Sequence, residues 1–299
     1  MSEPIVPSGR RWHRPWHRVG SPSGWRSRAV TAVIVGTGLA WLGWPIWDSV
    51  SNPGLAELVA RAPWLAAALV VGLVTLAVAL WRDAGCRTTT LGAVAVLVLG
   101  TCVVRAVLSP GEGGVEFVHA LPLLAGIALG GPAGFLTGAT AALVSTVLVG
   151  VPAETLPMQA LVWGLVGLSG SALSWLRPTT AWLCAVPLAV VAGVGSGVLL
   201  NLMGWGSEPG VSPTHFHPGL PPLEAARRLW AYTRETSLAL DATRGVTTAL
   251  VVLAVGRPVI VALRALPTLR GVTTPAPADL APHALARRED RDRLDRLWN

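Results

Sequence analysis

A set of polar side chains interrupts the apolar segments of this sequence and could bind a small molecule. The set combines guanidinium, carboxylate, imidazole, amide and indole groups, a mixture that suits a small polar molecule carrying a ring system. An arginine at mid-depth of a membrane costs about 2.5–3.5 kcal/mol, so such groups usually face a cavity or a partner. The candidate substrate-binding residues are Arg105, Glu116, His119, Gln159, Trp163, Asn201 and Asp241.

Plainer interpretations of these side chains stay open at this stage. Polar and tryptophan residues often anchor a helix at the membrane interface, and the sequence favours that role for Trp205 and Arg244. Arg105 and Glu116 could also form a structural ion pair with each other. A cavity is favoured over an anchor for four residues: Arg105, His119, Gln159 and Asn201.

Signatures of catalysis are missing from the sequence. It contains no HExxH, no GxSxG, no Walker A loop and no paired acidic motif of a phosphotransferase. An intramembrane enzyme acting on lipid would need a facing pair of catalytic groups, and only Glu116 with His119 could supply one. We therefore predict no enzymatic activity, no catalytic residue and no cofactor.

The potential metal ligands are too scattered to predict a metal site. Cys86, Cys102 and Cys184 are odd in number and show no CxxC spacing, so neither a disulfide framework nor a zinc site is supported. His215 and His217 lie two residues apart but have no third ligand nearby. Cys102 and Cys184 are better explained as small apolar packing residues.

Composition predicts a polytopic membrane protein. Hydrophobic residues make up 52% of the chain and charged residues 13%, whereas a soluble domain carries about 25% charged residues. Every basic side chain apart from histidine is an arginine, and the arginines are concentrated in the two tails. The high isoelectric point is therefore an orientation signal at a lipid bilayer rather than evidence for a nucleic-acid partner.

Eight apolar segments predict an all-α membrane bundle of about eight transmembrane helices, because most approach the roughly 20 residues that cross the hydrocarbon core. They lie near 29–48, 62–81, 89–108, 117–131, 132–150, 157–176, 180–204 and 243–265. With eight crossings, the arginine-rich connections and both tails fall on one side, which predicts cytoplasmic N and C termini. The candidate binding residues then lie near the outer ends of their segments. The tails are residues 1–28, which are basic and predicted to be disordered, and residues 267–299, which carry mixed charge.

The connection 205–241 is the one long outer loop in this arrangement. Its second half carries Leu223, Ala226, Trp230 and Thr233 at helical spacing. That spacing predicts a short amphipathic helix on the outer interface, where it could act as a lid.

Small residues recur at helical spacing and predict close helix packing. A stripe without side chains allows another helix to approach closely, and van der Waals contact then holds the pair together in lipid. The residues concerned are Gly130, Gly134, Gly138 and Ala142, then Gly164 and Gly167, and Gly193 and Gly197. Gly130-Gly131-Pro132 also predicts a tight turn or a break between the fourth and fifth segments.

Two stretches carry a family resemblance. The first, 117–175, contains LPLLAGIALGGPAGFLTGATAALVSTVLVG, then Pro157-Met158-Gln159 and the Trp163-to-Leu168 helix. The second, 232–264, has Thr236-Ser237-Leu238 and Asp241 before the last helix and Gly256-Arg257-Pro258 near its end. In these stretches the chain resembles the substrate-binding S components of energy-coupling factor (ECF) transporters, of the actinobacterial type.

The resemblance implies a six-helix substrate-binding core, here residues 88–266, with two extra helices in residues 29–87. It implies a cell-membrane protein that captures a vitamin or related micronutrient at the outer face. Its partners would be a transmembrane T component and two ATPase subunits. Many members dock the T component through an Ala-x-x-x-Ala repeat in the first core helix, which 89–108 lacks, whereas Ala68 and Gly72 have that spacing one helix earlier. Alternatives are another transporter or channel subunit, the lipid-acting enzyme and a purely structural protein.

Overall fold

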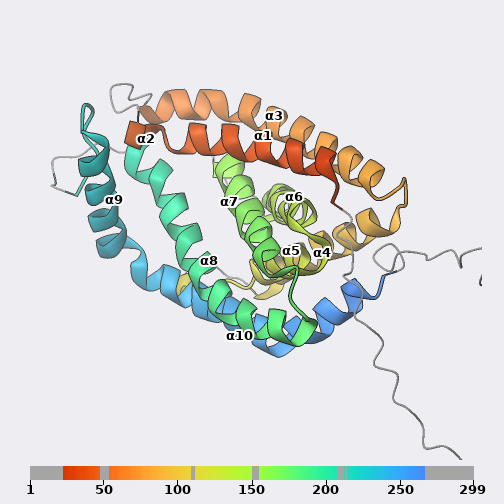
Figure 1. Cartoon of the computed structure of the whole chain (residues 1–299). Coiled ribbons are helices and arrows are strands. Elements are labelled where there is room, and N and C mark those ends of the chain that lie inside the picture. The colour runs from red at the N-terminus through yellow and green to blue at the C-terminus, as the bar shows by residue number, and fades with distance from the viewer. Residues whose placement is uncertain are drawn as a thin grey trace, which may run out of the picture.

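The computed structural model of the protein describes residues 23–47, 54–108, 112–149, 155–207, 212 and 214–266. These residues form a bundle of helices with connecting turns (Figure 1). The α-helices are α1 Trp25–Leu42, α2 Trp44–Trp47, α3 Gly54–Asp83, α4 Thr89–Leu108, α5 Ala120–Leu129, α6 Gly131–Val149, α7 Leu156–Ser169, α8 Pro178–Ser207, α9 Pro222–Thr236 and α10 Leu238–Arg264. Two 3-10 turns, η1 Glu112–Gly114 and η3 Gly170–Leu173, precede α5 and follow α7.

Six helices in the described residues are long and apolar enough to cross a membrane, which confirms the predicted helical membrane bundle. Their spans are Ala60–Asp83, Thr89–Leu108, Gly131–Leu148, Leu156–Leu173, Pro178–Gly206 and Leu238–Arg264. Helix α1, which carries Arg26 and Arg28 in its first turn, is not among them, and α5 has only ten residues. The count of eight crossings and the sidedness of the termini therefore stay predictions. Residues 1–22 and 267–299, which hold most of both predicted tails, lie outside the described residues.

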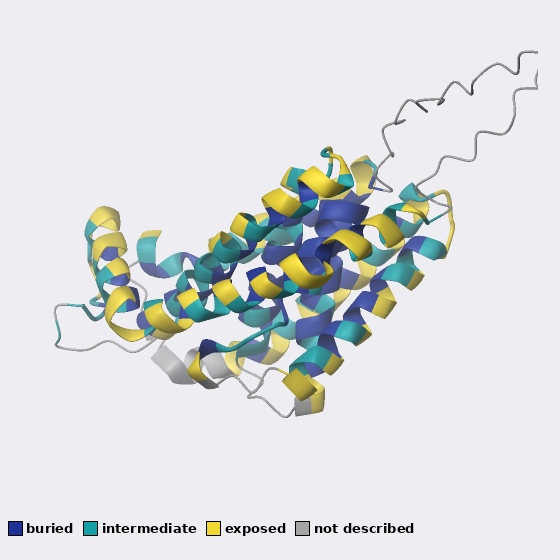
Figure 2. Ribbon diagram, turned by 90° about the horizontal axis from the view of Figure 1, so that it is seen from below, coloured by how far each residue is buried: buried dark blue, intermediate teal, exposed yellow. Residues whose placement is uncertain are grey.

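Helix α5 occupies the centre of the bundle. It contacts α4, α6, α7 and α10, and all of its residues except Leu121 are buried. Helices α1 and α3 lie side by side across one face of the bundle, and α8 lies along α10 on another (Figure 1). Buried residues accordingly gather in the middle of the bundle while exposed residues lie on its outer faces (Figure 2).

The outer faces of the candidate spans are apolar. Val71 of α3, Val96 and Val107 of α4 and Val147 of α6 are each more than 60% exposed. Such a surface would be unfavourable in water, because large contiguous apolar patches on soluble monomers are rare. A lipid environment removes that penalty, since lipid tails are as apolar as these side chains.

Glycines set the contacts between α5, α6 and α7. A Cβ added at Gly134 would overlap the carbonyl oxygen of Gly167, and one added at Gly138 would overlap that of Trp163. Gly130 ends α5 with φ 97°, which favours glycine, and α6 begins at the next residue. Gly164 lies against the ring of Phe135, and Ala142 is fully buried.

Close packing at glycines also joins α8 to α10. Gly193 lies against the backbone of Gly245, so a side chain at either position would force the two helices apart. One turn further along α8, Gly197 faces the carboxylate of Asp241, which occupies the space that a side chain would fill. The glycines of α8 therefore make room both for the backbone of α10 and for the Asp241 carboxylate.

A carboxylate from α3 closes the N-terminal end of α1. Oδ2 of Asp83 accepts hydrogen bonds from the backbone N–H groups of Gly24, at 3.0 Å, and Ser27, at 2.8 Å. The first N–H groups of a helix have no partner within it, and a negative charge there is favourable. Asp83 therefore ties the end of α3 to the beginning of α1.

The amphipathic helix predicted in the 205–241 connection is present as α9, but its buried face differs from the predicted one. Ala225, Leu229 and Thr233 are buried, whereas Leu223 is 65% and Trp230 51% exposed. Ala225, Leu229 and Thr233 follow one another at four-residue spacing and so share one face of α9, which packs on α2, α8 and α10. The predicted role as a lid stays a prediction.

Arg264 satisfies three carbonyl groups where helices end, and replacing it is expected to destabilise the fold. Its guanidinium donates to the carbonyl oxygens of Leu176 at 2.6 Å, Ser174 at 2.9 Å and Ile127 at 3.0 Å. In Arg264→Met these acceptors lose their donors, which we expect to lower the free energy of unfolding by about 1–2 kcal/mol.

Thermal unfolding of the detergent-purified protein measures this loss. Arg257→Met is the matched control, because Arg257 lies on the same helix, is exposed and makes one long contact, 3.4 Å, to Thr179. Equal melting temperatures for the two variants would contradict the role assigned to Arg264.

Candidate functional site

The seven candidate binding residues come from five parts of the chain and gather at one end of the bundle. That end is where α4 and α8 finish and where α5, α7 and α10 begin. The side chains fall into two connected groups, which meet at the short segment between Glu116 and His119.

The first group, which we call the arginine–tryptophan cluster, consists of Arg105, Ser145, Thr146, Gln159, Trp163 and His119. The Arg105 guanidinium donates to the hydroxyls of Ser145 at 2.8 Å and Thr146 at 3.2 Å. It also donates to the amide oxygen of Gln159 at 3.4 Å. Its central carbon lies 5.0 Å from the centre of the Trp163 ring, a cation–π distance. All of these partners of Arg105 are electrically neutral.

His119 completes this cluster from the beginning of α5. Its ring is fully buried and packs edge-on against Trp163, with ring centres 5.8 Å apart. Neither ring nitrogen has a hydrogen-bond partner among the described residues. A buried polar atom without a partner is unfavourable, so the ring has unused capacity to donate and accept.

The second group, which we call the ion-pair network, consists of Glu116, Arg244, Asp241, Ser237 and Asn201. Arg244 binds Glu116 with two nitrogens, at 3.0 and 3.3 Å, and Asp241 at 2.6 Å. Ser237 donates to the other carboxylate oxygen of Asp241 at 2.7 Å. Asn201 donates to Ser237 at 2.6 Å and to Thr233 at 3.1 Å, which links α8 to α9 and α10.

Two glycines bring Glu116 into the bundle. Gly113 and Gly114 have φ values of 60° and 76°, and the second packs directly on the backbone of Leu240. The chain then passes into the bundle, where Thr247 of α10 donates to the carbonyl oxygen of Glu116 at 2.9 Å. A larger residue at Gly114 would hold this segment away from α10 and separate Glu116 from Arg244.

The structure corrects three of the plainer interpretations. Glu116 forms its ion pair with Arg244 and not with Arg105, because η1 delivers it to α10 rather than to α4. Arg244 is therefore no interfacial anchor but the centre of the network. Trp205 is also buried, and its indole N–H donates to the carbonyl oxygen of Thr214 at 2.8 Å.

Some residues of the site were missed by sequence reasoning. Ser145, Thr146, Ser237, Thr233 and Thr247 look like ordinary hydroxyls of apolar helices, which usually bond to their own backbone. Ser145 and Thr146 lie near the C-terminal end of α6, and Arg105 lies near the C-terminal end of α4. The position of all three residues near helix ends was the sequence feature that could have indicated the contact.

The polar side chains of the two groups contact one another. Two cavities formed by described residues lie elsewhere. One, of about 390 Å³, is at the opposite end of the bundle. The other, of about 290 Å³, is an apolar recess between α4 and α10, lined by residues that include Phe117 and Leu121, which flank His119. None of the seven candidates lines either cavity.

Charge distinguishes the two groups chemically. The network holds two carboxylates and one guanidinium, whereas the arginine–tryptophan cluster holds one guanidinium with neutral partners. An arginine fork binds carboxylate or phosphate groups strongly. The carboxylate of Glu116 and the ring of His119, the one acid–base pair considered above, have different partners. No group of three potential metal ligands occurs in the described part of the chain.

Comparisons with protein-family models, with curated proteins and with solved structures find no match to this chain.

Proposed function

We propose that this protein is the substrate-binding S component of an ECF-type importer, capturing a vitamin-like micronutrient at the outer face of the cell membrane. The observation that carries the proposal is Arg105, a guanidinium within a candidate span. Its hydrogen-bond partners among the described residues are neutral, and it stacks on Trp163. Such a charge is costly in a membrane, and a ligand that supplies a negative group would offset it.

The arginine–tryptophan cluster would bind the ligand by exchange of partners. An anionic group on the ligand replaces the hydroxyls and the amide as the acceptor for Arg105. A ring on the ligand packs on the Trp163 indole. His119, whose ring nitrogens have no hydrogen-bond partner among the described residues, supplies a hydrogen bond. The ion-pair network holds the helices around this cluster in place.

The sequence resemblance supplies the rest of the proposal. Since the chain has no Walker A loop, the energy for uptake comes from two partner ATPase subunits. They act through the T component, which reorients the loaded protein and releases the ligand inside the cell.

Small molecules released when the detergent-purified protein is denatured provide the direct test. Mass spectrometry is expected to identify one stoichiometric organic molecule that carries a ring and an anionic group. Release of lipid alone, from protein grown with a full vitamin supply, contradicts the proposal.

Replacing Trp163 with alanine is expected to reduce retention of that molecule about tenfold, since an aromatic contact contributes about 0.5–1.5 kcal/mol beyond its buried area. Trp175→Ala is the matched control, because Trp175 is 81% exposed at the other end of the bundle. Ligand per protein, measured by the same mass spectrometry, checks the difference. Equal retention by the two variants would remove Trp163 from the site.

A further inference from the structure

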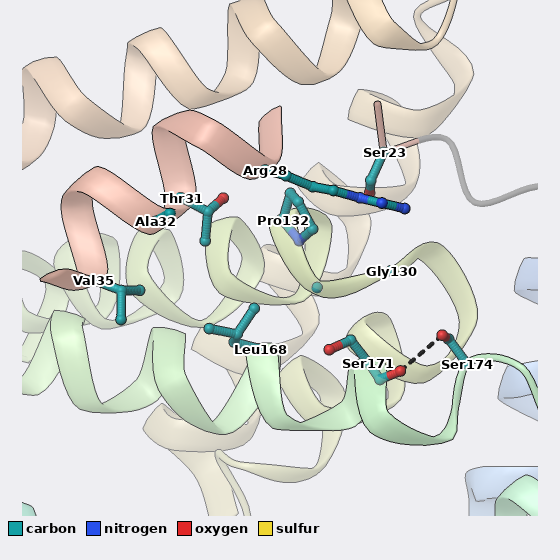
Figure 3. A pocket seen from close by; sticks show the side chains of 11 residues that line it. Ser23, Arg28, Thr31, Ala32, Val35, Gly130, Pro132, Leu168, Ser171 and Ser174 are labelled. Atoms are coloured by element: carbon teal, nitrogen blue, oxygen red, sulfur yellow. Dashed lines mark hydrogen bonds between the residues drawn. The ribbon is translucent and has the colours of Figure 1, made fainter. Parts of the chain in front are cut away.

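The cavity at the end of the bundle opposite the arginine–tryptophan cluster has the layout of a site for an amphiphile. It lies between the first half of α1, the turn that joins α5 to α6, and the end of α7 (Figure 3). Its volume of about 390 Å³ falls within the range of roughly 300–1,000 Å³ that is typical of small-molecule sites. Ser171, Ser174, Thr31 and Arg28 supply polar atoms, and Val35 and Leu168 are among its apolar residues.

Polar and apolar residues are separated along this cavity. Arg28 lies with Ser23 at one end, Ser171 and Ser174 lie across from them, and Val35 lies at the other end (Figure 3). The hydroxyls of Thr31 and Ser174 already donate to carbonyl oxygens of their own segments, at 2.8 and 2.7 Å. Arg28 is the charged donor among the residues that line the cavity.

The positive charge of Arg28 is available to a ligand. Its side chain is exposed and makes no ion pair within the described residues. Asp83, the acidic group at this end of α1, directs one carboxylate oxygen at the N–H groups of Gly24 and Ser27. Behind the opposite wall, Arg264 donates to the carbonyl of Ser174 and adds a second guanidinium. An anion is thus favoured at this end of the cavity.

The position of the cavity relative to the ends of the candidate spans indicates which kind of anion it would bind. The candidate span in α6 begins at Gly131, and the one in α7 ends at Leu173. Both boundaries adjoin the cavity, since Gly131 and Ser171 line it. The polar end of the cavity therefore lies where the lipid headgroups meet the hydrocarbon core, and the apolar end extends inward.

We propose that this cavity binds the phosphate group of an anionic phospholipid, with the Arg28 guanidinium on the phosphate and an acyl chain against Val35 and Leu168. The site is independent of the ligand captured at the other end. It would place a lipid between α1 and the helices α6 and α7.

Native mass spectrometry of the full chain, delipidated and titrated with phosphatidylglycerol, tests this assignment. Arg28→Gln is expected to weaken the first lipid-binding step about fivefold, the loss expected for one arginine contact at a membrane surface. Arg26→Gln is the matched control, because Arg26 lies on the same helix turn, stacks on Trp25 and does not line the cavity. Equal affinities for the two variants overturn the proposal.

A second variant tests the cavity without changing charge. Ala32→Phe fills the apolar end and is expected to weaken binding of phosphatidylglycerol at least as much as Arg28→Gln. Unchanged binding in Ala32→Phe, in protein that stays monodisperse, overturns the site. Parallel titrations with phosphatidylcholine and inorganic phosphate separate the possible sources of the phosphate. If phosphatidylcholine and inorganic phosphate both bind more weakly than phosphatidylglycerol, the site is for an anionic lipid. If inorganic phosphate alone prevents phosphatidylglycerol from binding, the site is for free phosphate and the proposal is overturned.

Discussion

Arg244→Met is expected to lower the free energy of unfolding by about 3–5 kcal/mol, the usual effect of removing one partner from a buried ion pair. The carboxylate of Asp241 is only 2% exposed, and Arg244 is the cation that binds it and Glu116. Without that cation two negative groups remain close together inside the bundle. Thermal unfolding in detergent measures the effect.

Arg228→Met is the control for this experiment. Arg228 also forms an ion pair with a carboxylate, Glu224 on the same helix, but the two side chains are 25% and 42% exposed. Exposed pairs contribute about 0–1 kcal/mol, so this variant should melt close to the parent protein. Neutralising both carboxylates as well, with Glu116→Gln and Asp241→Asn, should recover much of the stability lost in Arg244→Met. A small loss in Arg244→Met would contradict the buried network.

Gly134→Ala is expected to destabilise the protein by about 3 kcal/mol, near the upper end for overpacking a core. The added Cβ would overlap the carbonyl oxygen of Gly167 and approach the backbone of Gly126. Backbone atoms cannot rotate away as a flexible side chain can, so α6 must separate from α5 and α7. Loss of thermal stability, with retained helix content by circular dichroism, is the expected observation.

Gly195→Ala is the matched control for the glycine prediction. Gly195 lies within α8, and a Cβ built there meets nothing within 4 Å. Alanine is favoured over glycine in a helix by about 0.8–1.0 kcal/mol, so this variant should melt at or above the parent temperature. If both variants destabilise equally, close backbone packing is not the cause.

Local patterns predicted much of the fold. Segment 89–108 coincides with α4, and the break expected at Gly130-Gly131-Pro132 separates α5 from α6. Both features depend on residues that are near one another in the chain, namely a continuous apolar run and a glycine at a tight turn. The helix ends were less accurate. Helix α10 begins at Leu238 rather than near residue 243, and the residue before it, Ser237, accepts a hydrogen bond from Asn201 of α8.

Long-range pairing limited what the sequence predicted about the candidate site. Polar groups were expected near one end of the bundle, and they do lie there. Their partners could not be assigned, because Glu116 and Arg244 are 128 positions apart and η1 decides which helix Glu116 reaches. The same limit applies to α9, because the choice of its buried face depends on how the helix packs against α2, α8 and α10. A cavity also cannot be located from hydropathy, because it depends on how neighbouring helices pack together.

The hydrogen bonds from Asp83 to the start of α1 have a consequence for the order in which the chain enters a membrane. Every atom that they involve belongs to the first 83 residues, so they can form while the ribosome is still translating the helices of the core. N-terminal parts of a chain generally fold first during synthesis. We therefore expect helix α1, which is not apolar enough to count among the candidate spans, to enter lipid as half of a hairpin with the strongly apolar α3. The later helices are then expected to assemble against this existing pair.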